Sequence, residues 1–279
     1  MKNKLIMIEG IPGSGKTILS KRLEKFLTEK NLNVNLYNEG DIHPVDLAWT
    51  ALLEKDEFED LLKKFPKYKD IIIKNSKEEN EYVLVAYSLL GIGKDEPDLA
   101  EYFKSHAVYE KNDIDEFIDV HLKRWKAFSK SCDDSVYIFE CAFLQNHISK
   151  LLVQHNISTN IIKEHLANLL DSVSELNPKL IYLSQENIEE TINRVAKERL
   201  SPDKSKWSDW IDLVIQYVEK SEYGKVNNLT GFSGLISFLE TRKDLELEVV
   251  NSHENAIIIN NKDYNWDKVF EDIVKHLDL

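Results

Sequence analysis

The sequence of 279 residues has little cysteine, no excess of basic residues and no long apolar run. Its two cysteines, Cys132 and Cys141, lack metal-binding or redox spacing, which argues against a disulfide framework and favours a reducing compartment. The 36 basic residues are outnumbered by 49 acidic ones, giving a formal charge of −13. A protein that grips a nucleic-acid backbone needs many basic contacts, so a nucleic-acid polymer is not an expected partner.

Two further absences concern membranes. The central apolar stretch YVLVAYSLLGIG is about 12 residues long, too short to span a bilayer. The N-terminal run KLIMIE is too short for the apolar part of a signal peptide. We therefore expect a soluble, cytoplasmic protein without a membrane partner, and its length allows one large α/β domain.

Glycine is also scarce, with 9 residues, yet three of them lie in one octet near the N-terminus. Residues 10–17 read GIPGSGKT and fit the phosphate-binding loop pattern G-x-x-x-x-G-K-[ST], between an apolar strand and an amphipathic helix. The loop N–H groups and the helix dipole form a nest for phosphate oxygens, whereas the alternative is an ordinary glycine-rich turn. Lys16 would reach the β- and γ-phosphates, and Thr17 would offer its hydroxyl to Mg²⁺. The predicted nucleotide-binding residues are Gly10, Ile11, Pro12, Gly13, Ser14, Gly15, Lys16 and Thr17.

Apolar runs and helical patterns alternate along the chain. Strands are predicted at 5–8, 34–37, 136–139, 180–183 and 256–260, and helices at 17–30, 158–175, 187–200, 208–222, 233–243 and 266–277. This alternation predicts an α/β fold with a five-stranded parallel sheet flanked by helices. Ligands of such sheets bind at the carboxyl ends of the strands, so polar residues there are candidate site residues.

A long segment separates the second and third predicted strands. Residues 45–130 contain amphipathic patterns such as DLAWTALLEKDEFEDLLKKF and IDEFIDVHLKRWKAFSK, and also EENEYVLVAYSLL. We interpret the segment as a helical insertion that covers the acceptor site at the edge of the sheet. Because no Gly/Ser-rich linker isolates it, residues 1–279 are predicted to form a single domain.

Acidic residues follow the second predicted strand in the sequence NEGDIHP. Glu39 and Asp41 are predicted to accept a proton from an attacking hydroxyl, or to hold Mg²⁺ through water. A solvated turn is the alternative. His43 and Asp46 follow closely and are further candidates, although His43 and the proline after it can simply end the turn.

The third predicted strand, VYIF, is closed by Glu140. An acid in that place is rarely core unless it is paired, so we predict that Glu140 is a metal or catalytic residue, with Mg²⁺ as the metal. Gln145 and Asn146 come shortly afterwards. They either face an acceptor or cap a helix.

The main basic cluster lies in ENIEETINRVAKERLSPDKSKW, beyond the fourth predicted strand. Arg194 and Arg199 are predicted to stabilise charge on a transferred phosphoryl group. The alternative is pairing with Glu190 and Glu198 on an exposed helix. Arg124, in HLKRWKAF, either binds an acceptor anion or is a surface arginine.

With these motifs the chain resembles the thymidylate-kinase-like and deoxynucleoside-kinase-like P-loop kinases, over its first forty residues and more weakly over 136–279. The resemblance implies that Lys16 and Thr17 bind the phosphates of ATP and Mg²⁺. It also implies that Glu39 or Asp41 takes the acceptor proton and that Arg194 and Arg199 form a lid. Members of this class often dimerise through helices, so a homodimer is compatible with the resemblance.

The sequence departs from that class at two places. NEGD stands where thymidylate kinases have Arg-Glu-Pro, and Cys141 follows Glu140 where both families usually have arginine. The acceptor therefore stays open among a nucleoside, a nucleotide, a sugar and an antibiotic hydroxyl. Besides a small-molecule kinase, two alternatives stay open: a P-loop ATPase that acts as a switch on a protein partner, and a nucleotide-binding scaffold. A GTPase is disfavoured, because no N-K-x-D string occurs.

Overall fold

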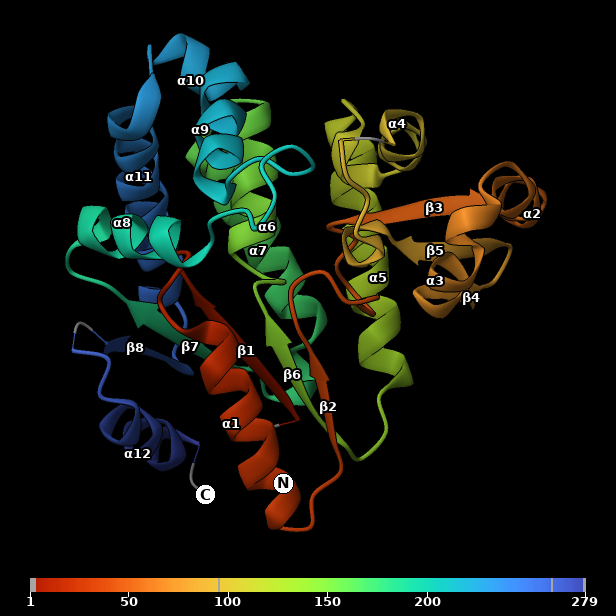
Figure 1. Cartoon of the computed structure of the whole chain (residues 1–279). Coiled ribbons are helices and arrows are strands. Elements are labelled where there is room, and N and C mark those ends of the chain that lie inside the picture. The colour runs from red at the N-terminus through yellow and green to blue at the C-terminus, as the bar shows by residue number, and fades with distance from the viewer. Residues whose placement is uncertain (1–3, 95, 262, 278–279) are drawn as a thin grey trace.

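The computed structural model describes residues 4–94, 96–261 and 263–277. Its main sheet has five parallel strands in the order β2-β6-β1-β7-β8 (Figure 1). The strands are β1 (Leu5–Gly10), β2 (Val34–Tyr37), β6 (Val136–Glu140), β7 (Lys179–Ser184) and β8 (Ala256–Asn260). All five predicted strands are confirmed, and so is the parallel arrangement.

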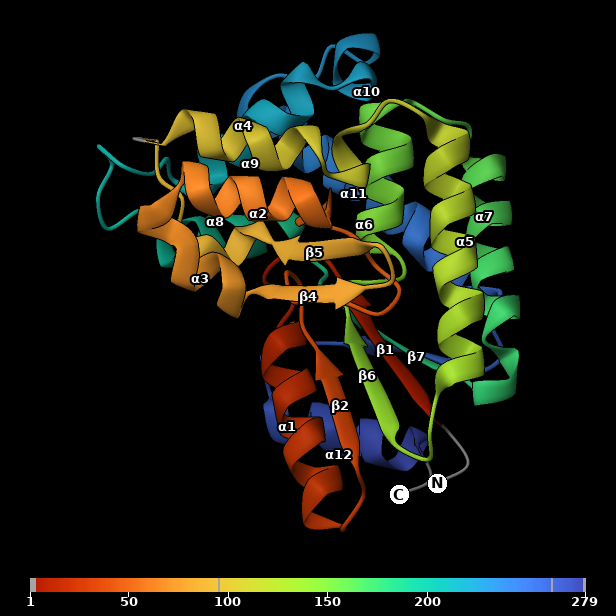
Figure 2. The same cartoon turned by 90° about the vertical axis from the view of Figure 1, so that its right-hand side faces the viewer.

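Helices cover both faces of this sheet (Figure 2). Leu5 and Met7 of β1 point into the core beneath α5 (Ile114–Ser131), α7 (Thr159–Ser172) and α11 (Gly231–Asn251). Ile6 and Ile8 point to the opposite side, toward α1 (Lys16–Glu29) and α12 (Trp266–His276). Burial on both faces explains the uninterrupted apolar runs, since each buried aliphatic side chain contributes about 1.5–3 kcal/mol.

The helices predicted outside the insertion are confirmed, with ends shifted by a few residues except in α11. The remaining helices there are α6 (Gln145–Ile148), α8 (Ile188–Glu198), α9 (Trp210–Lys220) and α10 (Glu222–Val226), and a π-helical segment at Ser149–Gln154 continues α6. Short 3₁₀ turns lie at Pro66–Tyr68, Tyr87–Leu90, Val108–Glu110 and Ser174–Leu176. The predicted helix 233–243 is part of the longer α11, because the buried positions continue through Leu245 to Val250.

The prediction of a helical insertion was wrong for three segments. Strands β3 (Thr50–Glu54), β4 (Ser76–Glu79) and β5 (Tyr82–Ala86) form an antiparallel sheet in the order β3-β5-β4. Asn80 adopts a left-handed backbone, with φ of 57°, in the two-residue turn between β4 and β5. Such a turn favours a hairpin over a helix, and the apolar β5 then packs into a separate small core. The helices of this region are α2 (Lys55–Lys64), α3 (Lys69–Lys74), α4 (Pro97–Ser105) and α5.

The topology creates a crevice between β1 and β6. The chain leaves β1 into α1 on one face of the sheet and leaves β6 into α6 and α7 on the other face (Figures 1 and 2). Open α/β sheets bind ligands at such a point, outside the carboxyl ends of the strands. Among the described residues, no helix combines the length and apolarity needed to cross a bilayer.

Candidate active site

The octet forms the loop between β1 and α1, at the crevice. Gly13 and Gly15 have φ of 82° and 97°, a left-handed backbone that favours glycine. A Cβ at these positions would lie 2.2 Å from Val195 Cγ2 and 1.8 Å from Trp266 Cη2, respectively. Glycine is therefore required at both positions for two reasons: the backbone conformation, and the close approach of α8 to Gly13 and of α12 to Gly15.

Lys16 begins α1 and is 6% exposed. Its Nζ donates to the carbonyl oxygens of Gly10, at 2.8 Å, and Ile11, at 3.1 Å. The Oε1 of Gln145 lies 3.5 Å from the same nitrogen. The ammonium group is thus held inside the loop, beside the positive end of the α1 dipole, where phosphate oxygens are favoured.

Thr17 and Glu140 meet directly across the crevice. The Thr17 hydroxyl donates to Glu140 Oε1 at 2.5 Å, and Glu140 is 4% exposed. Burial raises the pKa of Glu140, while the Thr17 hydroxyl and the Lys16 charge act in the opposite direction. A hydroxyl and a carboxylate are the hard oxygen donors that suit Mg²⁺, so the residues present fit that ion.

Glu39 joins this cluster, whereas Asp41 does not. Gln145 Nε2 donates to Glu39 Oε1 at 3.0 Å, so one side chain contacts both Lys16 and Glu39. Asp41 Oδ2 instead accepts hydrogen bonds from the backbone and side-chain nitrogens of Asn38, at 2.8 and 3.3 Å. In this structure Asp41 stabilises the turn after β2, and Glu39 faces the crevice.

Arg194 of α8 and Arg199, the residue that follows this helix, have different surroundings. Arg194 Nη2 donates to the carbonyl oxygen of Gly13 at 2.8 Å, and its guanidinium carbon lies 3.8 Å from the centre of the Tyr264 ring. Arg199 is exposed and lies over Trp210, at 5.1 Å from the ring centre. Only Arg194 of this pair contacts the phosphate loop here.

Two of the predicted acceptor residues lie on the insertion side. Arg124 forms an ion pair with both carboxylate oxygens of Glu79 and donates to the carbonyl oxygen of His43 at 3.3 Å. Asn146 Nδ2 donates to Asp46 Oδ2 at 2.6 Å. Both side chains therefore connect the insertion to its neighbours, and Arg124 already has a counter-charge.

Sequence reasoning missed Glu9, the fully buried fifth residue of β1. Its carboxylate accepts hydrogen bonds from the backbone N–H groups of Phe143, at 2.8 Å, and Gln145, at 3.2 Å. Burial raises its pKa to about 7, against the effect of these hydrogen bonds. An acid at the end of the apolar run LIMIEG was the available signal, since buried acids need partners.

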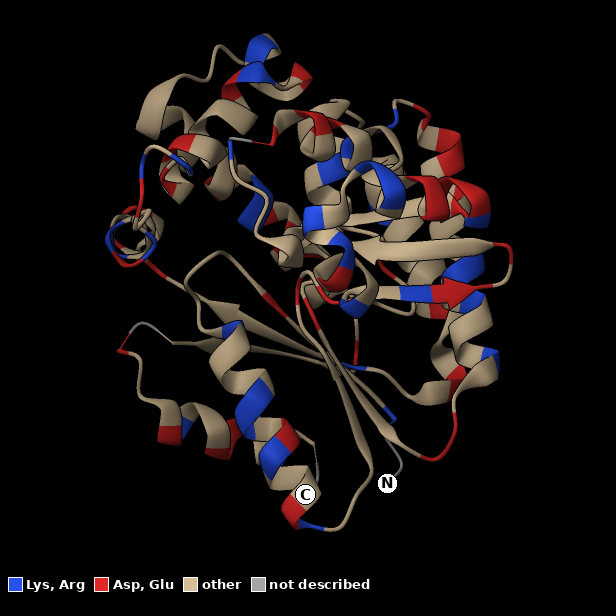
Figure 3. Ribbon diagram, turned by 45° about the vertical axis from the view of Figure 1, so that its right-hand side comes forward, with Lys and Arg blue, Asp and Glu red and all other residues tan. Residues whose placement is uncertain are grey.

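The charges of the molecule are mixed. In Figure 3, basic and acidic segments are interspersed along the helices of the insertion, and acidic segments lie at the carboxyl ends of the central strands beside the basic start of α1. The basic groups Lys16 and Arg194 thus act locally at the phosphate loop within an acidic chain. Such an arrangement suits a small anionic ligand.

The parallel sheet, with the octet after its central strand, defines the class of the protein: the chain has a P-loop NTPase fold. More particularly, a family model described as "Chromatin associated protein KTI12" matches residues 4–70, from β1 into the insertion. No curated protein matches the chain. The predicted superfamily is therefore supported, and the thymidylate-kinase-like group stays a prediction.

Among solved structures, 56 chains match. One of them, titled "Crystal structure of APE1195", is 10% identical with a TM-score of 0.33, covering 89% of this chain and 98% of that one. A likeness at this level carries no argument about function.

Proposed function

We propose that the protein is an ATP- and Mg²⁺-dependent phosphotransferase that transfers the γ-phosphoryl group to a hydroxyl or phosphate of a small molecule. The observation that carries this proposal is the cluster of five side chains at the phosphate loop. Gln145 lies within hydrogen-bond distance of both Lys16 and Glu39, and beside them the Thr17 hydroxyl donates a hydrogen bond to Glu140. Phosphoryl transfer needs positioning and charge stabilisation, which such a cluster supplies.

The nucleotide would be held by the octet. Its backbone N–H groups and Lys16 would bind the phosphates, and Thr17 and Glu140 would hold Mg²⁺, which neutralises phosphate charge when bound. Arg194 reaches the loop from α8 and would add positive charge on the opposite side. In this proposal the octet binds the phosphates without any contact from the insertion.

The acceptor would lie between Glu39 and the insertion. Glu39 lies in the turn after β2 and accepts a hydrogen bond from Gln145, so we assign it the role of accepting the acceptor proton. Residues 45–130 begin a few positions later and would cover this space as a lid over the acceptor. A nucleoside, a nucleotide, a sugar and an antibiotic hydroxyl are the classes to test.

A P-loop ATPase that switches a protein partner is the second candidate. It is favoured by the match to a family described as chromatin-associated and by the absence of arginine beside Glu39 and after Glu140. We further propose a cytoplasmic location, which rests on the free thiols of Cys132 and Cys141. A homodimer is a further proposal that rests on the kinase resemblance alone.

The test is transfer of radiolabel from the γ-position of ATP, with Mg²⁺, to a panel of nucleosides, nucleoside monophosphates, sugars and aminoglycoside-type antibiotics. Lys16→Ala serves as the blank. It should lower turnover by roughly 10²- to 10³-fold, because it removes the positive charge that stabilises the transferred phosphoryl group. Lys21→Ala, on the exposed side of the same helix, is the matched control and should keep activity.

A labelled organic product that is absent with Lys16→Ala supports the kinase and identifies its acceptor class. Label found only in free phosphate, whichever acceptor is present, favours the ATPase. Unchanged turnover in Lys16→Ala contradicts the assignment of the phosphate loop.

A further inference from the structure

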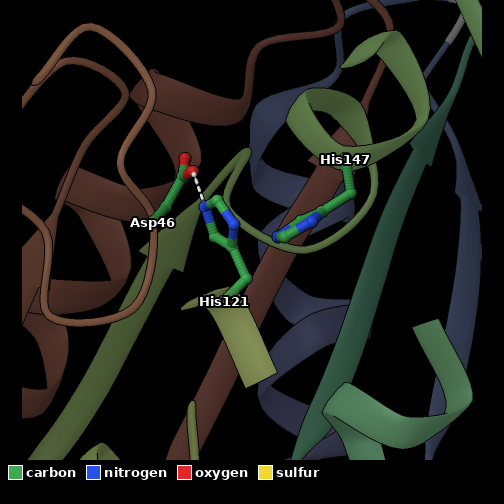
Figure 4. Close-up of side chains that lie close together, drawn as sticks. All are labelled: Asp46, His121 and His147. Atoms are coloured by element: carbon green, nitrogen blue, oxygen red, sulfur yellow. Dashed lines mark ion pairs between the residues drawn. The ribbon is translucent and has the colours of Figure 1, made fainter. Parts of the chain in front are cut away.

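A second buried polar cluster lies where the insertion joins the core, outside the phosphate loop. It consists of Asp46, in the connection between β2 and β3, His121 of α5 and His147 of α6, which are 5%, 0% and 0% exposed. One ligand atom from each lies within 4.8 Å of the other two. Figure 4 shows the imidazole of His121 between the carboxylate of Asp46 and the imidazole of His147.

The two imidazoles each leave one ring nitrogen without a hydrogen bond. Among the described residues, neither His121 Nε2 nor His147 Nε2 has a hydrogen-bond partner, although both are buried. His121 Nδ1 lies 2.8 Å from the carbonyl oxygen of Phe117, which can only accept, so Nδ1 carries the hydrogen. In the neutral ring Nε2 then presents a lone pair, and it lies 3.8 Å from Asp46 Oδ1.

Burying a polar atom without a partner costs about 1–3 kcal/mol, so two such atoms in one cluster call for an explanation. A polar core network would be expected to pair these nitrogens with each other or with Asp46. Hydrogen bonds to Asp46 instead come from Tyr109 Oη and Asn146 Nδ2, both at 2.6 Å, and from the backbone N–H of Ala48.

The surrounding contacts resemble those that orient metal ligands. A metal-bound histidine usually donates its other N–H to a carbonyl or a similar acceptor, which fixes the tautomer. His121 does so to Phe117, and His147 Nδ1 lies 3.0 Å from His165 Nε2, where it can do the same. Asp46 Oδ1 accepts from Tyr109 and from the backbone of Ala48, whereas Oδ2 accepts only from Asn146, which leaves a lone pair on Oδ2 for a metal ion.

We propose that Asp46, His121 and His147 bind one divalent transition-metal ion of the Zn²⁺ class. Two imidazoles and a carboxylate suit Zn²⁺, whereas Mg²⁺ prefers oxygen ligands and is assigned above to Thr17 and Glu140. Bonds of about 2.0–2.1 Å place tetrahedral ligands about 3.3 Å apart, so the three groups move together on binding. The ion stabilises the junction between the insertion and the core.

The proposed ion also connects to the phosphate site through α6. Gln145 contacts Lys16 and Glu39, Asn146 holds Asp46, and His147 is itself a ligand. Three successive residues of one helix thus join the two sites. The metal proposal does not depend on phosphoryl transfer, because it concerns other side chains.

The first experiment titrates the metal-free, full-length protein with Co²⁺ and, separately, with Zn²⁺. We expect one ion per chain by equilibrium dialysis, a visible Co²⁺ absorption typical of low coordination number, and a higher midpoint of thermal unfolding. Thr17→Ala should bind the ion equally well, since it alters only the phosphate site. A wild-type chain that binds neither ion at micromolar concentration overturns the proposal.

The second experiment locates the ion. His121→Asn keeps a donor toward Phe117 but removes Nε2, so Kd should rise at least about 10-fold. His121→Cys keeps a ligand and should add a thiolate-to-Co²⁺ charge-transfer band. His253→Asn and His253→Cys, in the turn before β8, are the matched controls and should behave as wild type.

The cysteine variant keeps the proposal testable even where His121→Asn fails to fold. Co²⁺ binding without a new band in folded His121→Cys overturns the site. An unchanged Kd in folded His121→Asn does the same.

Discussion

The two sides of the crevice differ in how the sequence specifies them. On the phosphate side, Lys16 and Thr17 belong to one octet. Thr17 contacts Glu140, the last residue of the neighbouring strand, and Lys16 contacts Gln145 shortly after it. On the insertion side, Asp46, His121 and His147 come from three segments and meet only through tertiary packing. The comparison teaches that a site built on one loop can be read from the chain, whereas a convergent site becomes visible only in the fold.

Glu9 lies between the two sides, and its substitution should have the largest effect of those described below. Its carboxylate accepts hydrogen bonds from the backbone N–H groups of Phe143 and Gln145. The side chain of Gln145 belongs to the phosphate side, and His147 of the insertion side follows two residues later. Burial raises its pKa to about 7, so between pH about 4.5 and 7 the folded chain keeps a proton that the unfolded chain has released. The stability contributed by this group is therefore complete below about pH 4.5 and is lost as pH rises through 7.

Glu9→Gln should remove that pH dependence. The free energy of unfolding of the variant, minus that of wild type, should rise by on the order of 3 kcal/mol between pH 5 and pH 8, since each unit of pKa difference corresponds to about 1.4 kcal/mol. Urea unfolding at both pH values measures it, with the exposed Glu240→Gln as control. A difference that stays constant with pH would show that Glu9 is ionised in the fold, and that the turn needs its charge.

Glu39 and Asp41 test the side of the crevice that faces the acceptor. Glu39→Gln keeps an oxygen for Gln145 but removes the base, so kcat for phosphoryl transfer should fall roughly 10²-fold with ATP binding unchanged. Asp41→Asn should have less than a roughly 10-fold effect, because this carboxylate bonds only to Asn38 among the described contacts. Single-turnover rates and nucleotide titrations separate the two steps.

Normal transfer by both variants would mean that the base lies elsewhere, and Glu140 would be the next residue to replace. A larger loss with Asp41→Asn than with Glu39→Gln would instead assign the proton transfer to Asp41. It would also mean that the turn after β2 rearranges during turnover.

The sequence predicted the core more fully than the insertion for a physical reason. Strands buried on both faces are continuous apolar runs, and the octet has a fixed spacing, so β1 and the phosphate loop could be located directly. In the insertion, YVLVA suits a strand or a buried helix equally well, and the short turn at Asn80 decides for the hairpin. The buried partners of Glu9 and His121 could not be predicted, because nothing local marks residues that meet across the fold.

Substitution of Arg194 and Arg199 should have the smallest effects on activity. The pair still allows a direct comparison, since the two residues are close in sequence and only Arg194 contacts the phosphate loop. Arg194→Ala removes the hydrogen bond to Gly13 and the stacking on Tyr264, so kcat/KM for ATP should fall by roughly 10-fold. Arg199→Ala, which removes a cation–π contact with Trp210 at the surface, should stay within about twofold of wild type.

Steady-state kinetics with ATP as the varied substrate measures both, and Arg194→Lys should recover only part of the loss, because lysine cannot reproduce the planar stacking. Equal losses in the two alanine variants would mean that α8 moves over the loop during turnover and brings both arginines to the phosphates, so that the nucleotide side, too, is completed by a residue that converges from a distance.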